Sequence, residues 1–181
     1  MARTELFVRK ASGGVFTVAN QSLTTGNIFF VDSGSSTGSD AAGYGNNPDA
    51  PFATWDYAVG QCTANNGDRI YLMPGHAETV SAAGGIDLDV AGVTTIGIGD
   101  GSDTPTVTLD TATTADVDVD AANVTVENVV FTANFADIAV GIDVNATDFT
   151  LRRCRFQETA TNMNAKIWVQ DAAAAASDRI T

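Results

Sequence analysis

The sequence predicts an all-β protein built as a solenoid of stacked parallel strands. Composition, short alternating apolar segments and an internal repeat carry this prediction. The 181 residues include 18 Asp, 4 Glu and 17 Gly, and Asp and Gly disfavour helix interiors. Thr and Val are abundant and favour strands. A chain of this length suits one domain that can bury a core of its own.

The internal repeat is the strongest signal. Residues 86–94, 117–125 and 142–150 match in character at almost every position, with offsets of 31 and then 25 residues, and a fourth copy begins at 167–169. A repeat of this length made of short alternating strands is typical of a solenoid. The alternation predicts one inward column and one outward column of side chains. The inward column is Ile86, Val117, Ile142 and Ile167; the outward column is Asp87, Asp118 and Asp143.

Two further strands complete each coil. Val124 with Val126 predicts a second strand, and Val129 with Phe131 predicts a third. The next coil repeats the pattern with Phe149, Leu151, Cys154 and Phe156. Asn123, Gly92 and Asp148 share one position of the repeat, which predicts a turn with left-handed backbone. Three short strands per coil joined by tight turns give a triangular parallel β-helix.

The first 76 residues are organised differently. Residues 1–27 form a lead-in with two short strands around Gly13-Gly14, which predicts a β-hairpin. A β-helix domain follows at 28–181, with a short helix at about 54–64, started by Thr54, that caps the N-terminal end. Coils are expected from about residue 69 onward. The repeat register ends inside a strand at Thr181, so we expect a longer natural chain or a second subunit over that end.

Several segments together resemble a known group of folds. They are Ile28-Phe29-Phe30-Val31-Asp32, Pro51-Phe52-Ala53-Thr54, Asn66-Gly67-Asp68-Arg69-Ile70-Tyr71-Leu72 and Pro74-Gly75-His76. This arrangement resembles the N-terminal entry of right-handed parallel β-helix proteins of the pectate-lyase-like superfamily. The resemblance covers residues 28–76, continues through the repeats, and implies right-handed winding. That fold carries lyases, hydrolases and inert virion parts, so it implies little about function.

One subset of these proteins is more similar. Residues 60–68, 74–79 and 119–125 are similar to β-helix proteins encoded by tailed bacteriophages. The similarity implies a virion component assembled in the host cytoplasm. We expect a capsid decoration or head-fibre protein without catalysis, forming a homotrimer and bound to the major capsid protein or another virion protein. The alternative is the opening part of a tailspike or tail fibre that binds or degrades host surface polysaccharide, with catalytic coils beyond Thr181.

The charge excludes other classes of function. Nine Lys and Arg stand against 22 acidic residues, giving a net charge of −13, whereas nucleic-acid binding needs a basic surface. No apolar run approaches the roughly 20 residues that span a bilayer. The N-terminus also lacks the apolar stretch of a secretory signal. We therefore expect neither nucleic-acid nor membrane partners, and no cofactor.

Few residues are candidates for chemistry. Arg152, Arg153 and Arg155 could include a catalytic base, but alternation favours exposed surface cations. We expect Asp87, Asp118 and Asp143 to form a solvent-exposed column of carboxylates. The weaker alternative is that neighbouring carboxylates of this column bind Ca²⁺. We name no catalytic residue. His76 is expected in a turn, and Cys62 and Cys154 as partly buried reduced thiols.

The lead-in is the expected docking element. It concentrates three of the nine cations next to apolar strands, while most of the chain is acidic. The docking residues we expect are Arg3, Leu6, Phe7, Val8, Arg9 and Lys10.

Overall fold

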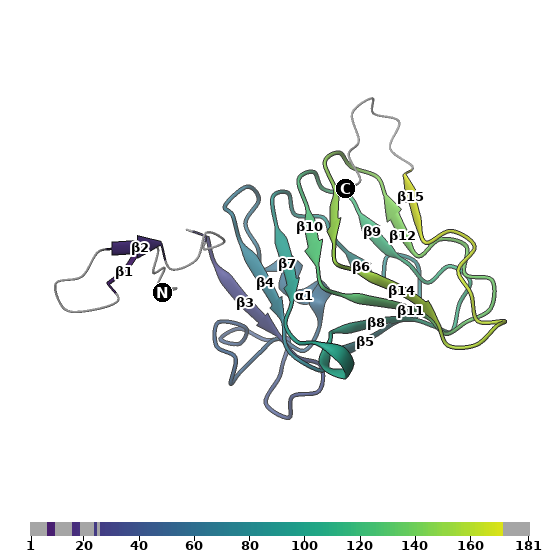
Figure 1. Ribbon diagram of the computed structural model, residues 1–181, viewed down its shortest axis with the longest axis horizontal. Helices are drawn as coiled ribbons and strands as arrows, with labels where there is room; N and C mark the ends of the chain where they lie inside the picture. Colours follow the sequence, from purple (N-terminus) through teal and green to yellow (C-terminus); the bar gives the residue numbers. More distant parts are fainter. Residues whose placement is uncertain (1–6, 10–15, 19–23, 25, 172–181) are drawn as a thin grey trace.

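Parallel strands stacked in three sheets form a β-solenoid of about four turns (Figure 1). This computed structural model describes residues 7–9, 16–18, 24 and 26–171. The predicted all-β solenoid is therefore confirmed, whereas its right-handed winding stays a prediction.

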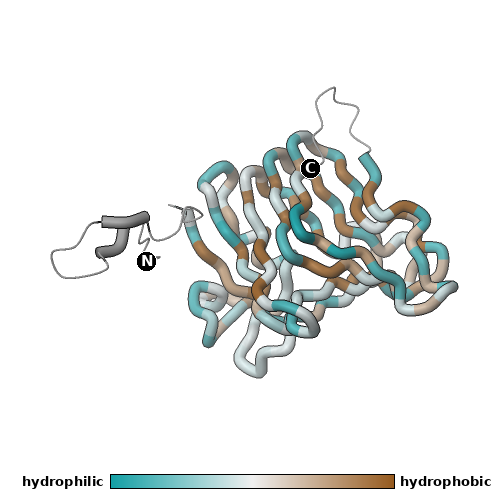
Figure 2. Tube along the Cα trace, in the orientation of Figure 1, coloured by the Kyte–Doolittle hydropathy of each residue, from teal (hydrophilic) through white to brown (hydrophobic). Residues whose placement is uncertain are grey.

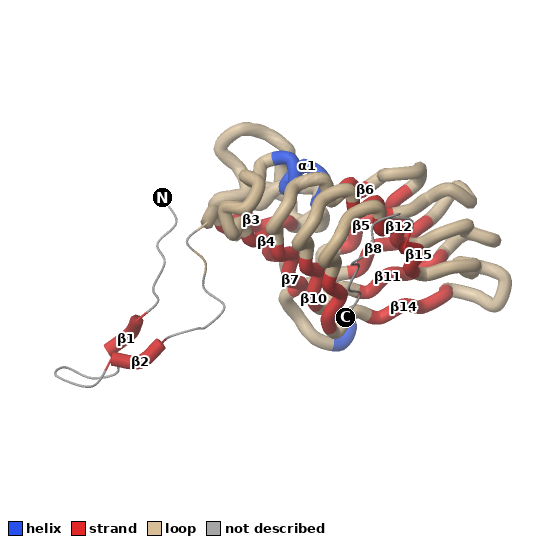
Figure 3. Tube along the Cα trace, turned by 90° about the horizontal axis from the view of Figure 1, so that it is seen from above, coloured by secondary structure: helices blue, strands red, loops and turns tan. Residues whose placement is uncertain are grey.

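Each coil contributes one strand to each of the three sheets. The first sheet contains β3 (Ile28–Val31), β4 (Arg69–Leu72), β7 (Thr94–Gly97), β10 (Thr125–Glu127) and β13 (Thr150–Arg152). The second contains β5 (Ala77–Val80), β8 (Thr106–Leu109), β11 (Val130–Ala133) and β14 (Arg155–Glu158). The third contains β6 (Ile86–Asp87), β9 (Val117–Val119), β12 (Ile142–Val144) and β15 (Val169–Asp171). Viewed from above, strands of successive coils lie in rows (Figure 3).

The predicted lead-in hairpin is present. Strand β1 (Phe7–Arg9) pairs antiparallel with β2 (Phe16–Val18), so that Phe7 lies opposite Val18. A 3₁₀ turn, η1 (Gly101–Asp103), connects β7 to β8.

The repeat register is confirmed for three copies and wrong for the fourth. Ile86, Val117 and Ile142 are directly aligned in the third sheet and are all buried. The next member of this column is Val169 and not Ile167, which is 43% exposed. The segment between β12 and β15 is therefore two residues longer than the repeat predicted. This shift keeps an apolar residue inward because strand alternation has a period of two.

The solenoid interior is lined by inward residues of all three sheets. Figure 2 shows apolar segments recurring in successive coils. In the first sheet the inward column is Phe29, Ile70, Thr95, Val126 and Leu151. Phe131 and Phe156, predicted to share a third strand position, are aligned and stack with ring centroids 5.6 Å apart.

Complete coils, with one strand in every sheet, begin at β4 (Arg69–Leu72), because the second and third sheets start with β5 and β6. Strand β3 pairs in parallel with β4 and extends the first sheet alone back to residue 28. The helix is shorter than the expected 54–64: α1 covers Trp55–Gly60, and Thr54 Oγ1 accepts a hydrogen bond from Tyr57 N. Helix α1 packs against β3, β4 and β6, with Trp55 fully buried. Its role as a cap stays a prediction.

The turns need left-handed backbone where the repeat indicated it. Asn123 and Asp148 have φ of 60° and 59°, and Gly92 has φ of 76°. A second turn column was not foreseen: Asn128 and Arg153 also have positive φ, 58° and 53°. Short polar side chains tolerate this conformation, which a longer side chain such as that of Arg adopts only under constraint from its surroundings.

Candidate functional site

A groove lies on the outer face of the first sheet. Its volume is about 530 Å³, which falls within the range of about 300–1,000 Å³ found for small-ligand sites. The groove is lined by Arg69, Tyr71, Thr94, Ile96, Thr125, Glu127, Arg152 and Arg153.

Strand alternation and register bring these side chains together. In β4, Ile70 and Leu72 are buried, so Arg69 and Tyr71 face outward. Parallel pairing then builds two outward columns across neighbouring strands. These columns are Arg69–Thr94–Thr125–Thr150 and Tyr71–Ile96–Glu127–Arg152. The groove therefore combines residues that lie up to 84 positions apart in the chain, from Arg69 to Arg153.

The groove carries excess positive charge in an acidic protein. Arg153 donates a hydrogen bond to Glu127 Oε1 and neutralises that carboxylate. Arg69 and Arg152 form no ion pair with any residue that the structure describes. The Nε of Arg69 is buried and lacks a hydrogen-bond partner. A buried donor without a partner is costly, so an anionic group in the groove would satisfy it.

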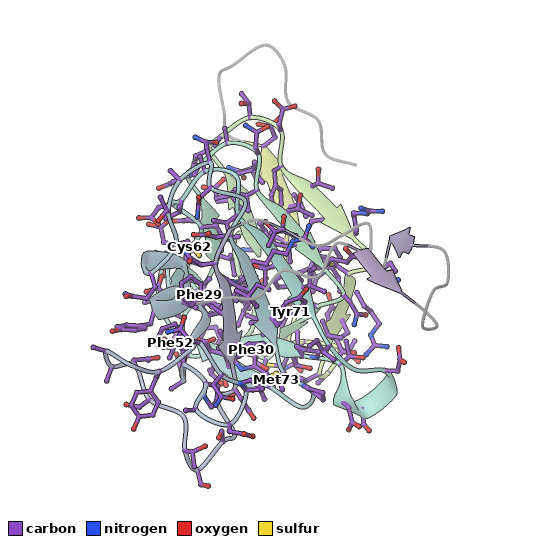
Figure 4. All side chains as sticks on the ribbon, turned by 90° about the vertical axis from the view of Figure 1, so that its left-hand side faces the viewer. Phe29, Phe30, Phe52, Cys62, Tyr71 and Met73 are labelled. Carbon is purple, nitrogen blue, oxygen red and sulfur yellow. The ribbon has the colours of Figure 1, made fainter. Side chains whose placement is uncertain are left out.

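An aromatic pair adjoins the groove. The rings of Phe30 and Tyr71 stack with centroids 5.9 Å apart and an interplanar angle of 24°. Figure 4 places Phe30 and Tyr71 together, with Phe29 and Phe52 nearer the helix. Phe29 is buried and belongs to the core, whereas Tyr71 is half-buried and offers a flat surface and a hydroxyl to the groove.

His76 is a structural residue at the corner between β4 and β5. Its side chain is buried, Nδ1 accepts a hydrogen bond from Ser33 N at 3.1 Å, and Nε2 lies 3.3 Å from Glu78 Oε2. The hydroxyl of Ser33 donates to Ala77 O and does not bond the imidazole. The three residues Ser33, His76 and Glu78 therefore lack the hydroxyl-to-imidazole contact that activates a serine nucleophile.

The predicted aspartate column exists. Asp87 aligns with Asp118, and Asp118 with Asp143, one residue per coil. Partial burial, together with the charges of Asp116, Asp120, Asp143 and Asp87, raises the pKa of Asp118 to about 6. Partial burial and then neighbouring aspartates, led by Asp120, also raise the pKa of Asp87. The column is therefore a site of mutual repulsion.

The column does not provide a metal-binding group. Within residues 26–171, no three or more His, Cys, Asp or Glu side chains are arranged to hold a metal ion. Asp87, Asp118 and Asp143 are aligned, as the calcium hypothesis requires, but they do not form a set of calcium ligands.

The remaining candidates occupy separate places. Arg152, Arg153 and Arg155 are exposed, as alternation with Cys154 and Phe156 predicts for Arg153 and Arg155. Cys62 and Cys154 are free, partly buried thiols. Burial, with a smaller effect of Asp68, raises the pKa of Cys62 to about 12, and burial raises the pKa of Cys154. Neither thiol is a ready nucleophile, because the thiolate is the reactive form.

The expected docking residues lie partly outside the described part of the chain. Arg3, Leu6 and Lys10 fall outside it. For Phe7, Val8 and Arg9 the structure gives the strand β1 and its pairing with β2. The docking role of these six residues stays a prediction.

Sequence reasoning missed the groove. Arg69 and Tyr71 alternate with the apolar Ile70 and Leu72, which is the signal that could have placed them outward. Their position in one groove with Arg152 depends on the register between coils, and the repeat found in the sequence starts at residue 86 and does not give that register for residue 69.

The fold and groove define this protein as a parallel β-solenoid with a cationic outer groove. A scan against protein-family models found no matching family, and searches of curated proteins and of solved structures found no match. Among the described residues, no helix is both long and apolar enough to cross a membrane.

Proposed function

We propose that the protein is a structural component of a bacteriophage particle, a capsid decoration or head-fibre protein without catalysis. The similarity of residues 60–68, 74–79 and 119–125 to phage β-helix proteins supports the phage assignment. The resemblance of residues 28–76 to the pectate-lyase-like superfamily supports right-handed winding as part of the same proposal. The non-catalytic role is supported by how the fold uses its polar residues: buried polar side chains that could perform chemistry hold the chain together.

Asp68 is the observation that best supports this structural role. Its carboxylate is fully buried and accepts hydrogen bonds from Asn27 N, Thr63 N and Asn66 Nδ2 at 2.6–2.7 Å. Asp40 likewise accepts from the backbone N–H of Ala53 and from the Thr54 hydroxyl, both at 2.8 Å. These carboxylates fix loops and leave little capacity for acid–base work.

Particle analysis tests this function. Particles purified from the source phage should contain the protein, and immunogold labelling should mark the head. A variant without residues 1–20 should lose capsid occupancy, because these residues include the proposed docking strands and three cations. Absence from purified particles would refute the virion role, and full capsid occupancy by the shortened variant would refute docking through the lead-in.

A second candidate is a receptor-binding part of a tail fibre or tailspike. The groove favours it, because free guanidinium groups, threonine hydroxyls and Tyr71 together suit a polar ligand such as a surface saccharide. Glycan binding that is lost in Arg69→Ala and retained in Arg155→Ala, with labelling on the tail, would support this candidate. Release of reducing ends from host polysaccharide would extend it to an enzyme.

A further inference from the structure

The positive charge of the solenoid is gathered at one end. Residues 26–171 contain five Lys and Arg, and four of them lie in the last coil, residues 149–171: Arg152, Arg153, Arg155 and Lys166. With Glu158 and Asp171 the last coil has a net charge of +2 (four minus two). Arg152, Arg153 and Arg155 are all exposed. Arg153 pairs with Glu127 and Lys166 pairs with Asp137, both in the preceding coil. Arg152 and Arg155 form no ion pair with any described residue, so the last coil presents unpaired positive charge at one end of an acidic rod.

The opposite end has the opposite charge. Residues 26–60, which we call the loop end, contain four acidic residues and no Lys or Arg, giving a net charge of −4. These residues are Asp32, Asp40, Asp49 and Asp56. Asp32 directly follows strand β3, Asp56 lies in helix α1, and Asp40 and Asp49 lie in the segment between these two elements. Strand β3 begins the solenoid (Figure 1).

The strand edges at the loop end are occupied by the chain itself. Phe30 N donates to Gly45 O, and Phe52 N donates to Phe30 O, at 2.8 and 2.9 Å, so a loop covers the edge of β3. Ser33 Oγ bonds both backbone groups of Ala77 in β5. Asp87 N in β6 donates to Asp56 Oδ1 at 3.0 Å. This end therefore presents polar loops and carboxylates.

The last coil differs from the loop end. Strands β13, β14 and β15 each pair with one neighbour only, β10, β11 and β12. The aromatic residues Phe156 and Trp168, whose centroids are 5.1 Å apart, are partly exposed, whereas Phe131 one coil earlier is 1% exposed. Within residues 26–171 this end is incompletely covered, and unpaired edges favour association.

We propose that copies of the protein associate end to end, with the basic last coil of one copy docked on the acidic loop end of the next. Opposite net charges attract the two ends, while the −13 charge of the whole chain disfavours contacts between copies in other orientations. The contact joins two different surfaces, so it is heterologous and can continue from copy to copy. End-to-end association does not depend on a phage location and could hold if the virion role failed.

Sedimentation velocity of the full chain tests end-to-end association. The protein should form dimers and longer species as concentration rises in about 50 mM NaCl, and association should weaken about 10-fold or more in about 500 mM NaCl, because salt screens the charges. Reversing the end charge with Arg155→Glu and Lys166→Glu should weaken association by about 10-fold or more. Neither residue lines the groove, so groove binding should persist.

Two controls make the result specific to the ends. Ala83→Glu with Thr114→Glu adds negative charge at exposed turn positions outside both ends and should leave association within about 3-fold of the wild type. Ser36→Lys, Ala42→Lys, Pro48→Lys and Asp49→Lys together change the net charge of the loop end from −4 to +1 (five added charges), at exposed positions whose side chains form no hydrogen bond among the described residues. This variant should also associate weakly alone. Circular dichroism and thermal unfolding confirm that each variant is folded.

Mixing the two reversed variants provides the decisive measurement. The acidic last coil of one variant faces the basic loop end of the other, so a one-to-one mixture should recover association to within about 3-fold of the wild type. A wild type that stays monomeric would overturn the inference. Full association of the Lys-substituted loop-end variant would also overturn it, because it would indicate contact between two last coils. Association confined to a chain shortened after Asp171 would show that residues 172–181 cover the last coil, and would likewise overturn it.

Discussion

The indole Nε1 of Trp55 donates a hydrogen bond to the hydroxyl of Thr95 at 3.1 Å, inside the solenoid. Both residues have 0% exposure. Trp55 is the first residue of α1, and Thr95 is the polar member of the inward column between Ile70 and Val126. This bond ties the helix to the second coil of the sheet, because each partner satisfies a polar group that the other buries.

Removing the hydroxyl at Thr95 should destabilise the protein. Thr95→Val keeps the side-chain shape but leaves the Trp55 N–H buried without a partner, which costs about 1–3 kcal/mol. Urea unfolding should show this loss with an unchanged slope. Thr94→Val, on the outward face of the same strand, is the control and should change stability by less than about 0.5 kcal/mol. Equal effects of the two substitutions would contradict the role of the Trp55 bond.

The aspartate column should make stability depend on pH. The pKa of Asp118 is about 6 in the folded protein, against an ordinary aspartate value of 3.8, so between these two pH values the folded state binds more protons than the unfolded state. Asp118 therefore destabilises the fold progressively as the pH rises through about 6. Asp118→Asn should raise the unfolding free energy at pH 7.5 by about 1 kcal/mol. This value is smaller than the pKa shift alone implies, because solvent screens the charge of a partly exposed carboxylate.

The pH dependence distinguishes this effect from general stabilisation. The advantage of Asp118→Asn over the wild type should shrink as the pH falls from about 7.5 to about 4, where Asp118 is itself protonated. Asp49→Asn, at an exposed loop position, is the matched control and should show no such trend. A gain that persists unchanged at low pH would mean that the repulsion is not its cause.

Two asparagines with the same backbone conformation should respond differently to substitution by Gly. Asn123 and Asn128 have φ of 60° and 58°, but Asn128 Nδ2 also donates to Gly97 O and Gly99 O at 2.9 and 3.0 Å. Asn123→Gly relieves left-handed strain and should be nearly neutral. Asn128→Gly should lose about 1–2 kcal/mol with the two bonds. Differential scanning calorimetry of the pair measures the difference, and equal melting temperatures would contradict it.

Asp68 should be essential for the start of the solenoid. Asp68→Asn replaces one acceptor oxygen by a donor that faces backbone and side-chain N–H groups, at a position with 0% exposure. Hydrogen bonds to a charged group contribute about 1.5–3 kcal/mol each, so chemical denaturation should show a loss of at least about 2 kcal/mol. Asp89→Asn, an exposed carboxylate, should not destabilise the protein; a similar loss there would argue against a special role for Asp68.

The sequence alone determined the solenoid. Alternation at Ile86-Asp87 and its copies specifies which side chains face inward, because strand period and coil repeat are local and visible in one dimension. The left-handed turn at Gly92, Asn123 and Asp148 followed from the same comparison. Periodicity failed at Ile167, because an insertion in the last loop changes the register without changing the local pattern.

Tertiary structure decided what the repeat could not express. The groove that Arg69 and Arg152 both line, the burial of Thr95 beside Trp55, and the different ends of the rod all depend on how the coils stack. These arrangements combine residues of different coils, where no local propensity specifies a neighbour. A residue's own strand determines whether it faces in or out, but the neighbouring coil determines which residue lies beside it, and the groove and the charged ends arise from that second choice.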